Sequence, residues 1–309
     1  MNWADPLFWE IVLAGAVRLG TPIMLAALGE TVVERGGTIN LGIDGMMLMG
    51  ALAGCIGASL AGWPAGIACG ALVGIVAGLG MSAAILYGRA NQIVVGIAIS
   101  VLGTGLTKYA FQLWQPPGSI SPPVPLVPTW SIPVLADIPW IGPVLFRQSL
   151  LTYGCIALIA AGTWALRRTR AGLILRATGD APEAIAFRGI NPVRVRTLTL
   201  AFGGMLAGIG GAAVTVGYLG AFSDGVIAGR GYVALAVVII GRWSPVGAAF
   251  GALLFAFFDS FALRVQSGGA DIPVEVYVAL PYAATLVALV LTMRSNIAPR
   301  ALGRPLEAE

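Results

Sequence analysis

The sequence predicts an all-α integral membrane protein with about nine transmembrane helices, within a range of eight to ten. Hydrophobic residues make up 58% of the 309 residues and charged residues only 10%, whereas a typical soluble domain has roughly 25% charged residues. The apolar residues are spread along the chain in runs near the length of about 20 residues that crosses a bilayer. The 43 glycines suit membrane helices that pack closely.

The spans are expected as follows. The first apolar run, residues 7–28, contains Glu10 and Arg18 and has neither the basic leader nor the cleavage pattern of a signal peptide, so we expect a retained helix. The other predicted spans cover residues 45–60, 64–87, 93–111, 149–166, 197–219, 231–241, 246–263 and 272–293. Together they form one transmembrane domain over residues 1–309.

Two loops set the predicted orientation. Residues 112–148 contain nine prolines, a density at which a helix cannot continue, so we expect a loop. The orientation set by the arginines places this loop outside. Residues 167–196 contain seven arginines. Because arginine and lysine concentrate in cytoplasmic loops, this second loop is predicted to be cytoplasmic, with the N-terminus outside and the C-terminus inside.

Glycines recur every fourth residue along the third predicted span, at Gly62, Gly66, Gly70, Gly74 and Gly78. Small residues at this spacing form a smooth stripe that lets a second helix approach closely. We therefore expect a tightly packed bundle, and the stripe carries no information about a substrate.

Several function classes are disfavoured by what the sequence lacks. It has no histidine, and its three cysteines lie inside apolar runs without CxxC spacing, so we expect no metal site and no cofactor. The glycine-rich turn followed by lysine that binds ATP phosphates is missing. We expect a protein that is not an enzyme, has no nucleic-acid partner, and relies on another chain if ATP drives it.

The first polar stretch that could carry function separates two hydrophobic runs, at residues 30–50. It contains acidic residues, Asn40, Asp44 and several glycines. Polar groups at membrane depth are costly and often line a path, and broken helices are a common way to build one. A plain cytoplasmic loop with Asp44 as a helix cap fits equally well, and both interpretations stay open.

The second stretch, DAPEAIAFRGINP at residues 180–192, predicts a short capped helix over 180–189 in the cytoplasmic loop. Asp180 would cap it, Glu183 lies at the third position, Gly189 would end it, and Pro192 would prevent its continuation. Such a helix is either a docking element or a solvated surface helix. The candidate docking residues are Asp180, Glu183, Ala184, Phe187, Arg188 and Gly189.

Three further polar residues are candidates for the substrate path. Asn91 and Gln92 open the fourth span and either cap it or face the path. Asp259 lies inside the eighth span, about one turn from Arg264. Because a buried charge is costly, Asp259 either lines the path or pairs with Arg264.

At these stretches the chain resembles a known family. ERGGTINLGIDGMMLMG at residues 34–50 is similar to the signature of ABC permeases for nucleosides and related sugars, within the branched-chain amino acid and simple-sugar permease group. Residues 183–192 with GGMLAGIGGA at 203–212 resemble that family's coupling-helix region and next span. The likeness covers essentially the whole chain. The family often has Glu where this chain has Asp44, which keeps the charge and shortens its reach.

The resemblance implies an importer permease bundle with pseudo-symmetric halves in the cell (inner) membrane. It implies three protein partners: a cytosolic ATPase that receives helix 180–189, a second permease, and an extracytoplasmic substrate-binding protein. The implied substrate is a nucleoside or related sugar. An alternative function is an ion-coupled secondary transporter, for which Asp44 and Asp259 are the plausible coupling carboxylates.

Overall fold

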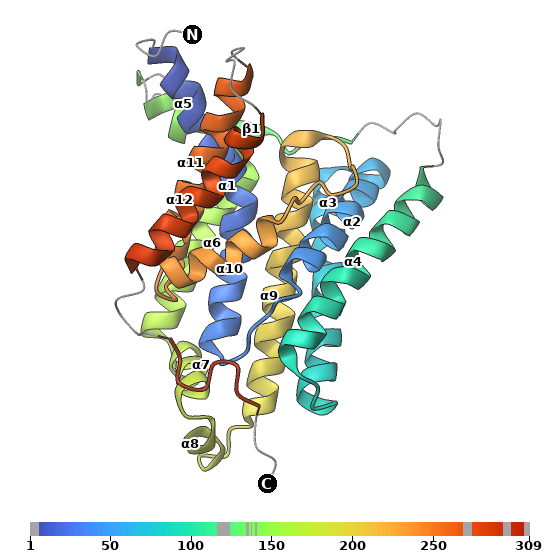
Figure 1. Cartoon of the computed structure of the whole chain (residues 1–309), viewed down its shortest axis with the longest axis vertical. Coiled ribbons are helices and arrows are strands. Elements are labelled where there is room, and N and C mark those ends of the chain that lie inside the picture. The colour runs from blue at the N-terminus through green and yellow to red at the C-terminus, as the bar shows by residue number, and fades with distance from the viewer. Residues whose placement is uncertain are drawn as a thin grey trace.

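The structure, a computed structural model, describes residues 6–115, 124–133, 136, 138–139, 141–267, 274–292 and 298–305. Helices dominate it (Figure 1). In chain order the elements are α1 (Pro6–Arg35), α2 (Ile43–Ala61), α3 (Trp63–Ser82), η1 (Ala83–Tyr87), α4 (Gln92–Trp114), β1 (Thr129–Ser131), α5 (Ile141–Leu145), β2 (Arg147–Ser149), α6 (Leu150–Arg168), α7 (Arg170–Asp180), α8 (Pro182–Ala186), α9 (Pro192–Val214), η3 (Thr215–Leu219), α10 (Arg230–Ile240), α11 (Pro245–Ser267) and α12 (Val274–Thr292). The segments η1 and η3 are single π-helical turns that extend α3 and α9.

Each predicted span coincides with a helix, to within a few residues at most ends. Seven helices of the described residues are long and apolar enough to cross a bilayer: α1, α2, α3 with η1, α4, α6, α9 with η3, and α11. Two shorter apolar stretches, Arg230–Ile240 and Glu275–Leu291, fall below that length. The chain is therefore a multi-pass membrane protein, and helix length alone does not confirm a count of nine crossings.

The proline-rich region is more structured than the predicted loop. Its strands β1 and β2 pair antiparallel, with Thr129 opposite Ser149, and the short helix α5 lies between them. A hairpin forms here because residues 129–131 and 147–149 contain no proline and can donate ladder hydrogen bonds. The described residues are mostly helical, as the predicted fold class requires, and this hairpin is an addition that the sequence did not predict. Residues 116–123 of the same region lie outside the described residues.

The centre of the bundle is a close contact between α2, α3 and α9. A Cβ placed on Gly74 would overlap the carbonyl of Gly204, and a Cβ on Gly204 would overlap that of Gly74. Gly70 and Gly208 face one another in the same way. A Cβ on Gly66 would likewise overlap the carbonyl of Gly54, and one on Gly78 that of Leu200. The predicted packing stripe is thus confirmed for these four glycines of α3, whereas Gly62 instead ends α2 with a φ of +86°.

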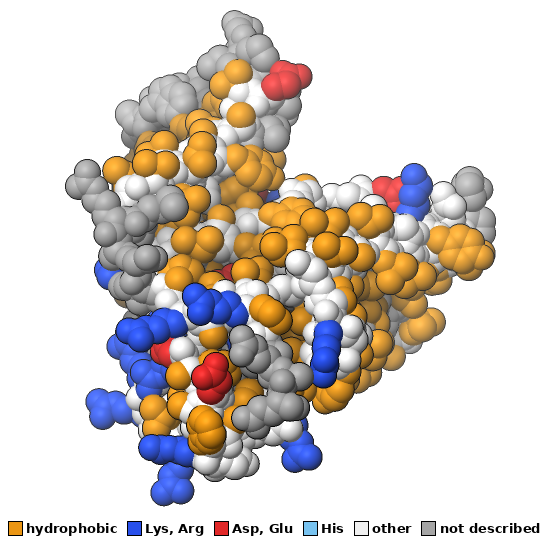
Figure 2. Space-filling model, turned by 60° about the horizontal axis from the view of Figure 1, so that its bottom comes forward, with side chains coloured by type: hydrophobic (Ala, Val, Ile, Leu, Met, Phe, Trp, Pro, Cys, Tyr) orange, Lys and Arg blue, Asp and Glu red, His pale blue; other side chains and the backbone are white. Residues whose placement is uncertain are grey.

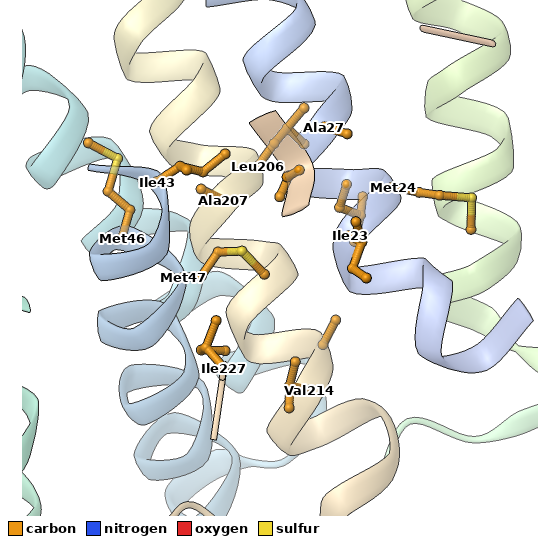
Figure 3. Packing of buried hydrophobic residues seen from close by; sticks show 14 of the residues in the cluster. Ile23, Met24, Ala27, Ile43, Met46, Met47, Leu206, Ala207, Val214 and Ile227 are labelled. Carbon is orange, nitrogen blue, oxygen red and sulfur yellow. The ribbon is translucent and has the colours of Figure 1, made fainter. Parts of the chain in front are cut away.

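Larger apolar side chains complete the core around these glycines. Ile23 and Met24 of α1 lie on one side of α9, and Met46 and Met47 of α2 lie on the other, with Leu206 of α9 between them (Figure 3). All five are almost fully buried. Dense packing of this kind fixes α1 and α2 relative to α9 and positions the polar residues that these helices carry.

Helices α2 and α10 begin partway along the molecule (Figure 1). The non-helical residues 36–42, named here the re-entrant segment, leave the bottom of α1 and run upward beside α9 to the start of α2 (Figure 1). Similarly, residues 220–229 lead from the top of α9 down to α10, which crosses the middle of the bundle. The start of α1 and residues 298–305 lie at opposite ends of the molecule (Figure 1).

Candidate functional site

Asp44 lies in the first turn of α2 and reaches a different helix. Its Oδ1 accepts a hydrogen bond of 3.0 Å from the backbone N–H of Gly231, the second residue of α10. The first N–H groups of a helix have no partner within it, so the carboxylate completes the start of α10. The interpretation of Asp44 as the cap of its own helix is wrong, because Gly42 occupies that position without a side-chain bond.

Only glycine allows this approach. A Cβ at Gly231 would overlap the backbone of Asp44. The absence of a side chain therefore lets the start of α10 lie directly against the start of α2. The two helices that begin partway along the molecule meet at this point.

An ion pair lies one residue away. Arg230 Nη2 and Asp259 Oδ2 are 3.2 Å apart, and their side chains are 17% and 21% exposed. Arg230 Nη1 also donates to the carbonyl of Val226 at 3.3 Å. Of the two alternatives that the sequence left open for Asp259, a place on the path or a pair with Arg264, the second named the wrong arginine: α10 brings Arg230 to Asp259 from another helix.

Two tyrosines border this ion pair. Tyr282 donates from its hydroxyl to the carbonyl of Ala228 at 3.0 Å. The hydroxyl of Tyr218 and the Nε of Arg230 are buried without a hydrogen-bond partner among the described residues. Both tyrosine hydroxyls lie within electrostatic reach of Arg230 and Asp259. A buried polar atom with unused hydrogen-bonding capacity is uncommon and calls for a partner.

We refer to Asp44, Tyr218, Arg230, Asp259 and Tyr282 as the central polar cluster. It joins residues from α2, η3, α10, α11 and α12. The cluster combines acceptors, hydroxyls and one guanidinium, which suits a polar solute rich in hydrogen-bonding groups. Of the predicted path residues, Asp44 and Asp259 belong to it. Arg230 and the tyrosines were missed, although an arginine beside a short apolar helix was a usable signal.

Asn40 and Gln92 belong to a separate network that holds the re-entrant segment. The backbone N–H of Asn40 donates to Glu30 Oε1 at 3.1 Å, and Gly42 N donates to Asn40 Oδ1 at 3.0 Å. Gln92 accepts from the backbone N–H of Ile39 at 3.0 Å. Asn40, Gln92 and Glu30 are all buried. These side chains therefore replace the backbone hydrogen bonds that a non-helical segment lacks.

Asn91 has a purely local role in the structure. It is exposed, and its Oδ1 accepts from the N–H of Ile93 at 2.9 Å and of Val94 at 3.4 Å. This is the N-cap arrangement. The capping interpretation of Asn91 is confirmed, and the residue lies apart from the central polar cluster.

Two residues make contacts across long sequence distances. Trp243, which is half-buried, donates from its indole N–H to Glu34 near the end of α1. Arg196, counted among the cytoplasmic arginines, is 2% exposed and donates to the carbonyls of Gly36, Ala301 and Arg304. Long-range contacts of this kind leave no local signature in a sequence.

The predicted docking helix exists in shortened form as α8. The prediction that Asp180 caps it is wrong: Asp180 is the last residue of α7, and its Oδ1 accepts from the N–H of Arg300 at 3.3 Å. The break falls at Ala181, whose φ and ψ of −151° and 76° are not helical, because proline at 182 disfavours helical geometry in the residue before it. Gly189 has a φ of +76°, which is the left-handed geometry expected where the helix ends.

An exposed apolar side chain lies directly after α8. Phe187, the residue that follows its last helical position, is 85% exposed, whereas Ile185 within the helix is buried. Glu183, Ala184 and Arg188 are exposed. The bottom of the molecule around α8 gathers blue arginine side chains (Figure 2). The exposed arginines of this region are Arg167, Arg168, Arg170, Arg188, Arg194, Arg300 and Arg304.

These features define a class of protein: a multi-pass membrane protein whose interrupted helices surround a polar cluster. The chain belongs to the family described as branched-chain amino acid transport system / permease component, whose model matches residues 12–290. Among the described residues, no group of three or more His, Cys, Asp or Glu side chains could hold a metal ion.

Characterised relatives share nearly the full length. The chain is 33% identical to the nucleoside ABC transporter permease protein NupC of Lactococcus lactis, over 98% of both chains. It is 31% identical to the guanosine ABC transporter permease protein NupQ of Bacillus subtilis, over 96% of both. A third relative is the putative glucose ABC transporter permease protein TsgC13 of Haloferax volcanii, at 32% identity over 83% of this chain and 78% of the relative.

Proposed function

We propose that this chain is the membrane-spanning permease subunit of an ABC importer for nucleosides, located in the cell (inner) membrane. The observation that carries the proposal is the end-to-end similarity to two permeases named for nucleoside or guanosine transport. The glucose permease TsgC13 is of similar identity, and what separates it from the two nucleoside permeases is that it is matched over less of both chains. Family membership also favours an ABC importer over the ion-coupled transporter that the sequence left open.

Three further subunits complete the proposed importer. A cytosolic ATPase supplies the nucleotide chemistry, a second permease completes the path, and an extracytoplasmic protein delivers the substrate. This chain makes and breaks no covalent bond in the substrate and is not an enzyme. The shorter stretches Arg230–Ile240 and Glu275–Leu291 would complete nine crossings, arranged as two pseudo-symmetric halves.

The proposed docking surface for the ATPase is α8 with the residues that follow it. Phe187 is the most exposed of the large apolar side chains of the described residues. An exposed aromatic residue surrounded by charges is the typical anchor of a protein interface. Glu183, Ala184, Arg188 and Gly189 would form its rim. Asp180 would act indirectly, because its carboxylate already accepts from Arg300.

The proposed path passes the central polar cluster. The ribose and base of a nucleoside present hydroxyls and ring nitrogens, which match the unsatisfied Tyr218 hydroxyl and the carboxylates of Asp44 and Asp259. Asn40 and Gln92 would support the path by holding the re-entrant segment in place. ATP binding to the partner would switch the path between its two openings, and hydrolysis would reset it.

The test is an affinity purification of this chain from native membranes in mild detergent, followed by mass spectrometry. The proposal predicts that an ATPase and a second permease co-purify with it, and that the ATPase is lost when Glu183 and Arg188 are both replaced by Ala. The exposed Arg167→Ala serves as a matched control, because it removes a nearby charge outside α8. If the chain purifies alone, the ABC assignment is contradicted.

A further inference from the structure

Residues 298–305, named here the strap, lie between the proposed docking helix and the re-entrant segment. In Figure 1 the strap is the dark red loop at the bottom of the bundle. The N–H of Ala301 donates to the carbonyl of Gly179 at 2.8 Å, at the end of α7. The N–H of Arg300 donates to Asp180 at 3.3 Å. One edge of the strap is thus fixed to the two residues that immediately precede the break before α8.

The other edge of the strap holds the re-entrant segment. The N–H of Gly303 donates to the carbonyl of Gly37 at 3.2 Å. Gly303 also lies close to Ile39, since a Cβ at position 303 would be 3.2 Å from its Cδ1. The strap therefore bridges α7 and the re-entrant segment by direct main-chain hydrogen bonds on both sides.

Arg196, from α9, stabilises this bridge with three further hydrogen bonds. Its Nε donates to the carbonyl of Gly36 at 3.1 Å, its Nη1 to that of Arg304 at 3.0 Å, and its Nη2 to that of Ala301 at 3.4 Å. The guanidinium is planar and offers five donors in a fixed fork. One buried side chain thereby ties the strap and the re-entrant segment together at three carbonyls.

We propose that the strap and Arg196 are positioning elements of the transport cycle: they transmit the movement of the docking helix α8 to the re-entrant segment and so to Asp44. The proposal rests on the proposed function for the role of α8. The chain of contacts is short. Gly179 and Asp180 lead to Ala301, Gly303 leads to Gly37, and the re-entrant segment ends where α2 begins, one residue before Asp44.

A rigid bridge is the physical requirement for such a role. Coupling between distant sites needs packed or hydrogen-bonded elements with a defined arrangement. Here the main chain itself forms the link, so its loss does not remove any side chain of the docking surface or of the central polar cluster. The strap is therefore expected to control how much transport each ATP hydrolysed produces.

The first test measures the link in the purified chain, with no partner present. Ala301→Pro removes the N–H that binds Gly179, and Arg196→Lys removes the three-carbonyl fork while keeping the charge. The double variant Arg300→Ala/Arg304→Ala is the matched control, because the hydrogen bonds of these two residues to Asp180 and Arg196 use their backbone atoms. Hydrogen exchange of residues 38–44 should accelerate in Ala301→Pro and Arg196→Lys and stay unchanged in the control. Unchanged exchange in both would overturn the proposal.

The second test uses the assembled transporter in proteoliposomes. In Ala301→Pro and Arg196→Lys, we expect the ATPase subunit to stay bound and to hydrolyse ATP at an unchanged rate. The amount of nucleoside moved per ATP hydrolysed should fall about tenfold. Uptake and hydrolysis that fall in equal proportion would overturn the proposal, because that outcome indicates a general loss of stability. If the unmodified chain binds no ATPase, the proposed function fails, and the exchange experiment still decides whether the strap holds the segment.

Discussion

Asp44 accepts a hydrogen bond from the backbone N–H of Gly231 across 187 positions of sequence, at 3.0 Å. This bond joins α2 and α10, the two helices that begin partway along the molecule. Because Arg230 is the neighbour of Gly231 and pairs with Asp259, the same contact also aligns the ion pair. The start of α10 is therefore the point at which the central polar cluster is assembled.

Replacement of Asp44 should separate its capping role from its charge. We expect Asp44→Ala to lower the free energy of unfolding by about 1 kcal/mol, because the start of α10 loses its acceptor. Asp44→Asn keeps an oxygen acceptor, so its free energy of unfolding should fall by clearly less. Thermal unfolding in detergent measures both. Asp224→Ala, at an exposed carboxylate in the 220–229 connection, is the control. Equal losses for Ala and Asn would contradict the capping role.

The Arg230–Asp259 ion pair should behave as a unit. We expect Arg230→Met and Asp259→Ala each to cost about 2 kcal/mol, because each leaves a partly buried charge without its partner. The double variant should lose less than the sum of the two. A double-mutant cycle on thermal unfolding measures this difference. Strict additivity of the two losses would show that the two charges do not interact. Lys108→Met, at an exposed site, is the control for the loss of a charge alone.

The glycine contact between α3 and α9 should tolerate no side chain. Gly74→Ala places a Cβ against the carbonyl of Gly204, and overpacking of this kind costs about 1–3 kcal/mol. Gly80 of the same helix has open space around its missing Cβ. Gly80→Ala should therefore leave the unfolding temperature unchanged or raise it slightly. If both variants unfold alike, the close contact of the two helices is wrong.

Phe187 should anchor the ATPase. We expect Phe187→Ala to weaken ATPase binding by about 30-fold or more, as for an interface residue worth about 2 kcal/mol, without altering the fold of the chain. The amount of ATPase that co-purifies, together with the unfolding temperature, measures both effects. Leu60→Ala is the matched control, because Leu60 is 79% exposed at the far end of α2. If the same amount of ATPase co-purifies with the Phe187 variant, the proposal that α8 forms part of the ATPase interface is contradicted.

The sequence predicted most of what depends on local chemistry. Hydrophobic runs located every long helix, glycine spacing located the packing face of α3, and Asn91 and Gly189 take the capping and left-handed geometries expected of their residue types. These features depend on neighbours close in sequence, which is why a pattern reveals them. The short β1–β2 hairpin was not predicted, because the many prolines of this region indicate a loop and its two proline-free strands are only three residues long.

Residues whose roles depend on distant partners could not be assigned in this way. Arg196 has the composition of a cytoplasmic loop arginine, and only the fold brings it against carbonyls more than 100 positions away. Asp259 was matched with the arginine nearest in sequence, whereas α10 supplies Arg230. Trp243 and Glu34 likewise meet only through the packing of α1 against the α10–α11 corner.

The most direct test of the account is uptake of a radiolabelled nucleoside by vesicles that contain the assembled transporter. We expect saturable uptake that requires ATP, persists when ion gradients are dissipated, and is lost when Phe187 is replaced by Asp. Uptake that follows an ion gradient and survives the Phe187 replacement would contradict it.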